Sequence, residues 1–274
     1  MGNMKIWILT FNRPHALNRL INQLGNQGQG VCILSNHPTL KIAKVNEQFL
    51  DRVIINTLNS PDSNAWTARA WNVIMQKAFE HTNDLVALQD DTSIRSGFIE
   101  HLSKQREHYD FIAASGGDQF FFIRKSVLQR TGWFDERYIG SYCQDADYWK
   151  RVYMAYNHDR LRDRISIEES HNWGFSWNAC GLFDYIDTEM HVKAIDPDYV
   201  NQHYEIERIH NSTTDDNPTL KYCQQHFKDK WGIELDNGKP VIADLNRKMR
   251  DIDWYPAYSK KFDITFYDQQ EKEL

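Results

Sequence analysis

No segment of this 274-residue chain reaches the roughly 18 to 20 consecutive apolar residues that a membrane-spanning helix needs. The opening segment 1–10 has one lysine and a brief apolar run, which is too short for a signal peptide and predicts a first strand. We therefore expect no membrane span, no membrane partner and a cytoplasmic location.

Cysteine is scarce, and the four cysteines form no Cys-x-x-Cys pair. They are Cys32, Cys143, Cys180 and Cys223. Such wide spacing favours buried free thiols in a reducing compartment over a disulfide framework.

An excess of positive charge is missing as well. The 32 basic and 38 acidic residues give a formal charge of −6, so a broad surface for nucleic acid is excluded. Individual arginines can still hold a diphosphate.

Several sequence motifs of nucleotide-binding and hydrolytic enzymes are also absent. The glycine-rich segment 25–30 follows a predicted helix and precedes a predicted strand, which is the wrong order for a dinucleotide-binding loop. The chain has neither a phosphate-loop lysine motif nor a Gly-x-Ser-x-Gly elbow. These absences argue against a dehydrogenase, a P-loop kinase and a serine hydrolase.

Strand-like and helix-like segments alternate over the first 115 residues. The apolar runs 5–9, 31–34, 52–55 and 84–88 predict strands, and helical spacing is found at 14–24, near 40–48 and at 64–81. This alternation predicts an α/β fold with a mostly parallel, Rossmann-like central sheet and helices on both faces. Ligands of such sheets bind beyond the carboxyl ends of the strands.

The rhythm changes in the second half of the chain. Further strands are predicted at 111–114, 119–124 and 164–168, and helices at 126–129 and about 146–156. Beyond about residue 171 we expect an irregular, partly helical region, with helices near 199–208 and 220–230.

The predicted strand 84–88 leads directly to the adjacent acids Asp90 and Asp91. Magnesium or manganese bound to a diphosphate needs only one or two protein carboxylates. In this interpretation Asp91 binds the cation, and Asp90 contacts the ribose or a metal-bound water. A turn with helix-capping character is the alternative, and the residues alone leave both open.

A second acidic cluster, 144–149, opens the predicted helix 146–156. Asp145 is a candidate general base that removes a hydroxyl proton, or else an N-cap. Asp147, two residues on, faces another side of the helix, so the two acids should not share one role. For Asp147 we expect either an acceptor contact or a structural role beside an arginine.

Aromatic and polar residues near the predicted strand ends are the other candidates. Trp133 is expected to stack on an acceptor sugar, whereas the three phenylalanines at 120–122 favour a core strand. His171, after the last predicted strand, would complete the metal site, with three later histidines as competitors. Nucleotide-binding candidates, each equally compatible with a solvated surface, are Thr10, Asn12, Arg13, Asn36 and Arg69.

The order of these motifs resembles that of the GT-A glycosyltransferases, especially the family-2-like members. The resemblance covers roughly residues 4 to 175. It rests on segments 10–14, 72–78 and 88–91 and, more specifically, on segments 116–137 and 144–151. The chain is also similar to enzymes of this type encoded by large algal DNA viruses, which would imply the host cytoplasm.

The resemblance implies a catalytic core at 1–175 that binds a UDP- or GDP-linked sugar. It implies a C-terminal extension at 176–274 that packs on the core and shapes the acceptor site. Mn²⁺ or Mg²⁺ would bind Asp91, and Asp145 would be the catalytic base of a hexosyltransferase. The sugar would move to a hydroxyl of a glycan or another acceptor, with inversion.

Two residues depart from the family pattern. Gln89 replaces the first acid of the metal-binding motif, and Gln144 replaces the glutamate before the catalytic aspartate. We expect each to remove a charge near the diphosphate. Both glutamines favour one alternative function, a catalytically inactive glycan-binding module. Another alternative, a sugar-phosphate nucleotidyltransferase, would need a glycine- and lysine-rich phosphate loop after the first strand, which the sequence lacks.

Overall fold

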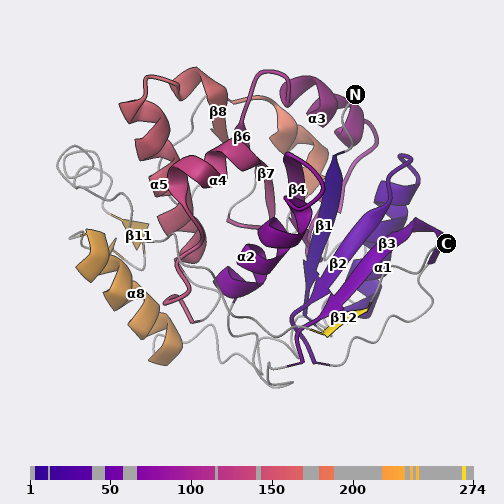
Figure 1. The fold of residues 1–274 in the computed structure, drawn as a ribbon, viewed down its shortest axis with the longest axis horizontal. Helices are drawn as coiled ribbons and strands as arrows, with labels where there is room; N and C mark the ends of the chain where they lie inside the picture. Colours follow the sequence, from indigo (N-terminus) through magenta and orange to yellow (C-terminus); the bar gives the residue numbers. More distant parts are fainter. Residues whose placement is uncertain are drawn as a thin grey trace.

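A broad central sheet runs through the computed structural model, with helices on either side (Figure 1). The structure describes residues 4–11, 13–38, 47–57, 67–114, 117–139, 143–168, 179–187, 218–231, 235–236, 239–240 and 267–269. None of the helices in these ranges is long and apolar enough to cross a membrane.

The sheet has eight strands in the order β12-β3-β2-β1-β4-β7-β6-β8. Six strands point the same way, and β7 and β12 run against them. The predicted mostly parallel α/β sheet is therefore confirmed. The strand bounds are β1 Lys5–Thr10, β2 Val31–Ser35, β3 Leu50–Ile55, β4 Asp84–Gln89, β6 Phe111–Ala114, β7 Phe120–Arg124, β8 Ile165–Glu168 and β12 Tyr267–Gln269.

Both faces of the sheet are covered, which explains why its strands are continuous apolar runs. Side chains alternate along a strand, so Ile6 and Ile8 of β1 pack on one face and Trp7 and Leu9 on the other. The first face is covered by α1 (Pro14–Gly25) and α3 (Phe98–Gln105). The second is covered by α2 (Thr67–Ala78), α4 (Lys125–Thr131) and α5 (Gln144–His158).

Several short elements were not predicted from the sequence. Helix α3 buries only Phe98 and Leu102, which is too few positions for a clear helical period. The pair β5 (Ser93–Ile94) and β9 (Ile186–Asp187) forms a small antiparallel ribbon. A second ribbon joins β10 (Leu235–Asp236) and β11 (Lys239–Pro240), and single 3₁₀ turns lie at η1 (Glu47–Phe49), η2 (Arg162–Arg164) and η3 (Leu182–Tyr185). The helix expected at 199–208 and most of that at 40–48 lie outside the described residues.

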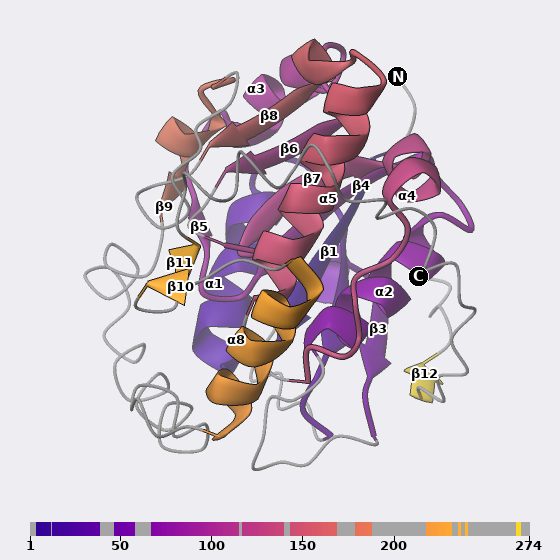
Figure 2. The same cartoon turned by 90° about the vertical axis from the view of Figure 1, so that its left-hand side faces the viewer.

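Two C-terminal elements lie against the rest of the fold. Strand β12 pairs antiparallel with β3, where Tyr267 lies opposite Ile55. Helix α8 (Pro218–Trp231) lies beside α5 in Figure 2. The division at residue 175 stays a prediction.

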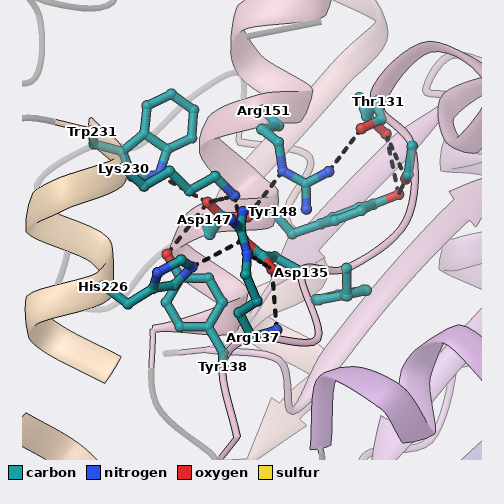
Figure 3. A network of polar contacts seen from close by, with 12 residues as sticks. Thr131, Asp135, Arg137, Tyr138, Asp147, Tyr148, Arg151, His226, Lys230 and Trp231 are labelled. Atoms are coloured by element: carbon teal, nitrogen blue, oxygen red, sulfur yellow. Dashed lines mark hydrogen bonds and ion pairs between the residues drawn. The ribbon is translucent and has the colours of Figure 1, made fainter. Parts of the chain in front are cut away.

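Buried charges join α8 to α5 (Figure 3). Asp147 is fully buried and accepts hydrogen bonds from Arg151 at 2.9 Å, Lys230 at 2.6 Å and the Trp231 indole at 2.8 Å. Lys230 also lies 2.8 Å from Asp135 Oδ2. Burial opposes the charge of Asp147, but Lys230 and Arg151 outweigh it and lower its pKa. Asp147 thus stays ionised inside the protein.

We expect Asp147→Asn to lower the free energy of unfolding by about 3–5 kcal/mol, because it leaves buried cations without their partner. Urea unfolding followed by tryptophan fluorescence measures this. Lys104→Ala is the control: it removes an ion pair with Glu100 that is largely exposed on both sides, and the urea midpoint should hardly move. An equally small effect of Asp147→Asn would show that the buried charges do not support the fold.

Candidate functional site

The topology gathers polar residues at the carboxyl edge of the parallel strands. Leu9 of β1 lies opposite Gln89 of β4, so Thr10 and Asp90 follow side by side. Asn36 follows β2, and its N–H donates to the Thr10 carbonyl at 2.8 Å. Strand β7 runs antiparallel to β4, so the segment before β7 begins at this same edge, and the Gln89 N–H donates to the Gln119 carbonyl at 2.8 Å.

Asp90 faces inward from this edge and is 2 % exposed. Its Oδ2 accepts hydrogen bonds from the Thr10 hydroxyl at 2.5 Å and the Phe11 N–H at 3.4 Å. Burial, with a smaller effect of Asp91, raises the pKa of Asp90 to about 6, although Arg13, 3.4 Å from Oδ1, opposes the rise. The prediction of a ribose or water contact for Asp90 is not tested by these bonds.

Asp91 is held from one side only. Its Oδ2 lies 3.3 Å from the Arg13 guanidinium and 3.5 Å from the Gln119 amide. Its Oδ1 is buried and has no hydrogen-bond partner among the described residues. A buried carboxylate oxygen without a donor is costly, and a hard divalent cation would satisfy it. Asp91 therefore fits the predicted metal ligand.

A cation site built from the protein alone is not found in the described part of the chain: no group of three or more His, Cys, Asp or Glu side chains comes together there. A cation on Asp91 would need phosphate oxygens and water as further ligands, and with these one or two carboxylates suffice. His171, the second predicted ligand, lies outside the described residues, as does Asn12.

Asp145 lies in the first turn of α5 and is 9 % exposed. Burial and, after it, the nearby Asp118 carboxylate raise its pKa to about 7, against the N–H groups of Ala146 and Asp145, which lower it. Gly117 approaches this side chain closely, since a Cβ on Gly117 would lie 2.9 Å from Asp145 Oδ2. A carboxylate with a pKa near neutrality has the properties of a general base, as the sequence predicts.

Asp118 is the functional candidate that the sequence analysis missed. It is 6 % exposed, and its side chain accepts hydrogen bonds from Gln89, Trp71 and Gln144. Burial raises its pKa, as does Asp91, while the Trp71 and Gln144 donors lower it. The only signal in the sequence was its place just before the strand with three phenylalanines, β7. That place becomes part of the site because β7 pairs antiparallel with β4 and so begins at the carboxyl edge.

The other predicted donor-binding residues are engaged within the protein. Arg13 lies against both Asp90 and Asp91, as described above. The Asn36 side chain is buried and accepts a hydrogen bond from Asn56 at 2.8 Å. Arg69, on α2, lies 3.6 Å from Glu136. The structure thus brings Thr10 and Arg13 to the acids, holds Asn36 beside Thr10, and directs Arg69 to the loop that follows α4.

The two predicted acceptor residues have different surroundings. Trp133 is partly buried and packs against the core on the α5 side of the sheet. Asp147 is fully buried and joins α5 to α8, which agrees with the structural alternative for this residue. A contact of either residue with an acceptor stays a prediction.

No protein-family model matches this chain, and no curated protein sequence matches it. Solved structures are similar over part of it, and they include the following two. Glucosyl-3-phosphoglycerate synthase from Mycobacterium tuberculosis, solved with Mn²⁺, UDP and glucosyl-3-phosphoglycerate, has 10% identity over 61% of this chain and 70% of its own, with a TM-score of 0.45. A Drosophila β1,4-galactosyltransferase 7 mutant, solved with manganese, UDP-Gal and xylobiose, has 11% identity over 68% and 71%, with a TM-score of 0.38. Similarity at this level does not establish a shared activity.

Proposed function

We propose that this protein is a glycosyltransferase of the GT-A type that moves a sugar from a nucleoside diphosphate to an acceptor hydroxyl. The observation that supports the proposal is the different surroundings of two buried carboxylates, Asp91 and Asp145, at the carboxyl edge of the sheet. Asp91 has a buried oxygen without a donor, as a cation ligand requires. Asp145 has a pKa near neutrality, as a general base requires.

The nucleotide would lie across the ends of β1 and β2, next to Thr10 and Asn36. Arg13 already contacts Asp90 and Asp91, so a donor diphosphate would compete with these acids for its guanidinium. Arginine suits this exchange because its planar fork of donors matches phosphate as well as carboxylate. Asp90 would contact the ribose or a metal-bound water, as the sequence predicts.

Asp145 would take the proton of the acceptor hydroxyl, and the acceptor oxygen would form a bond to the anomeric carbon. The bond from that carbon to the diphosphate would break, and the nucleoside diphosphate would leave with its electron pair. Attack from the side opposite the leaving group inverts the anomeric configuration. Bound on Asp91, Mn²⁺ or Mg²⁺ would supply charge stabilisation for the leaving diphosphate.

Titration calorimetry with UDP- and GDP-sugars, with and without Mn²⁺, tests the cation ligand. We expect one nucleotide to bind only with Mn²⁺. Asp91→Asn should weaken this binding by about tenfold or more, the factor that corresponds to about 1.4 kcal/mol. The matched control is Glu100→Gln, which neutralises a carboxylate exposed on α3 and should leave binding unchanged.

Equal binding by native protein and Asp91→Asn would remove Asp91 from the cation site. Metal-independent binding of a glycan, with no sugar nucleotide bound, would favour the inactive binding module instead. Binding of a nucleoside triphosphate together with a sugar phosphate would favour the nucleotidyltransferase.

The pH dependence of turnover tests the base. Asp145 must be ionised to accept a proton, so kcat/KM for hydrolysis or transfer of the bound sugar nucleotide should fall as the pH is lowered through about 7. Asp145→Asn should lower kcat by about 100-fold or more and leave nucleotide binding largely intact. A variant that keeps near-native kcat would exclude Asp145 as the base.

A further inference from the structure

Asp118 is held by three hydrogen-bond donors from three different elements. The Gln89 amide at the end of β4 donates to Oδ1 at 2.6 Å. The Trp71 indole of α2 and the Gln144 amide of α5 donate to Oδ2 at 2.5 and 3.2 Å. All three are neutral donors, and within the described ranges no cationic side chain pairs with Asp118.

This arrangement gives a use to the two glutamines that depart from the family pattern. An acid at position 89 or 144 would repel Asp118 across a hydrogen-bond distance. An amide at either position donates to it instead. Positions 89 and 144 carry no charge in this chain, but the Asp118 carboxylate, with which both amides form hydrogen bonds, supplies a negative charge next to them.

Two routes lead from Asp118 to Asp145. Gln144, whose amide is anchored on Asp118, is the residue directly before Asp145. Gly117, directly before Asp118, leaves only enough room for the Asp145 carboxylate. The residue before Asp145 is thus tied to Asp118, and the Asp145 side chain itself lies against Gly117.

We infer that Asp118 is a positioning residue, which holds the Asp145 carboxylate in place through Gln144 and keeps it basic through its own negative charge. The inference relies on the proposed function only for the role of Asp145 as the base.

The groups around Asp145 support the direction of this effect. Asp118 faces it from the loop before β7, and the Cys143 thiol lies at the head of its own helix. The charge of Asp91 in turn raises the pKa of Asp118. Three N–H donors favour the ionised form of Asp118, whereas only backbone N–H groups favour that of Asp145. Asp118 therefore ionises first, and its charge opposes the ionisation of Asp145.

Asp118→Asn removes the charge and keeps the shape. With its oxygen at the Oδ2 position, the asparagine amide can still accept from Trp71 and Gln144. Its N–H group then faces Gln89, whose side-chain amide can turn to present its oxygen as the acceptor. The folded state should survive the change, and circular dichroism checks this.

The experiment is a ¹³C NMR titration of protein labelled at the aspartate carboxyl carbons, with the Asp145 signal assigned by its loss in Asp145→Asn. We expect the pKa of Asp145 to fall by about one pH unit in Asp118→Asn. Asp118→Asn combined with Gln144→Glu returns a carboxylate beside Asp145 and should restore the raised pKa. An unchanged titration in folded Asp118→Asn overturns the inference.

Asp118→Ser is the second variant, and it carries the test if Asp118→Asn does not fold. Its hydroxyl can still accept a hydrogen bond but bears no charge, so the pKa of Asp145 should fall by about as much as in Asp118→Asn. No movement in folded Asp118→Ser would also overturn the inference.

The titration needs no substrate, so its result is independent of the calorimetry with sugar nucleotides. A lowered Asp145 pKa without any nucleotide binding would support the role of Asp118 and refute the proposed function. Nucleotide binding with an unchanged Asp145 pKa would do the reverse.

Discussion

The carboxylates of Asp90, Asp91, Asp118 and Asp145 are buried at one edge of the sheet, where like charges repel each other far more than in water. Each is compensated differently. Asp90 lies against Arg13 and the Thr10 hydroxyl, and Asp91 against Arg13 and the Gln119 amide. Asp118 accepts from three neutral donors, and Asp145 is favoured by backbone N–H groups alone. Under this unequal compensation, burial raises the pKa of Asp90 to about 6 and that of Asp145 to about 7. One edge of the sheet can therefore hold both the proposed cation ligand and the proposed base.

The reversed direction of β7 is what brings Asp118 to the same edge as the other acids. In a fully parallel sheet every loop at the carboxyl edge would follow a strand and lead into a helix. Because β7 runs against β4, a loop that precedes a strand also opens at this edge and brings Asp118 with it. Helix α5 then returns to the same region and presents Asp145 from its first turn.

Much of the sheet was predictable because both of its faces are buried, which leaves strands as unbroken apolar runs. Asp90, Asp91 and Asp145 could be proposed from the sequence because they follow a strand or open a helix, which are local signals. Asp118 has no such local signal. It reaches the site because β7 pairs with β4, which brings it into contact with Gln89, 29 residues earlier in the chain. The contact between α8 and α5 joins residues still farther apart in the sequence, since Trp231 and Asp147 are separated by 84 positions.

The first turn of α5 carries two acids with different surroundings, Asp145 and Asp147. Asp145 faces Asp118 and Gly117, whereas Asp147, two residues on, is bound by Lys230 and Trp231 of α8. Removal of α8 would leave Asp147 beside Arg151 without the other two donors and would loosen the helical turn that presents Asp145. The smallest unit able to carry out the proposed reaction must then extend through Trp231, 63 residues beyond the end of β8 at Glu168.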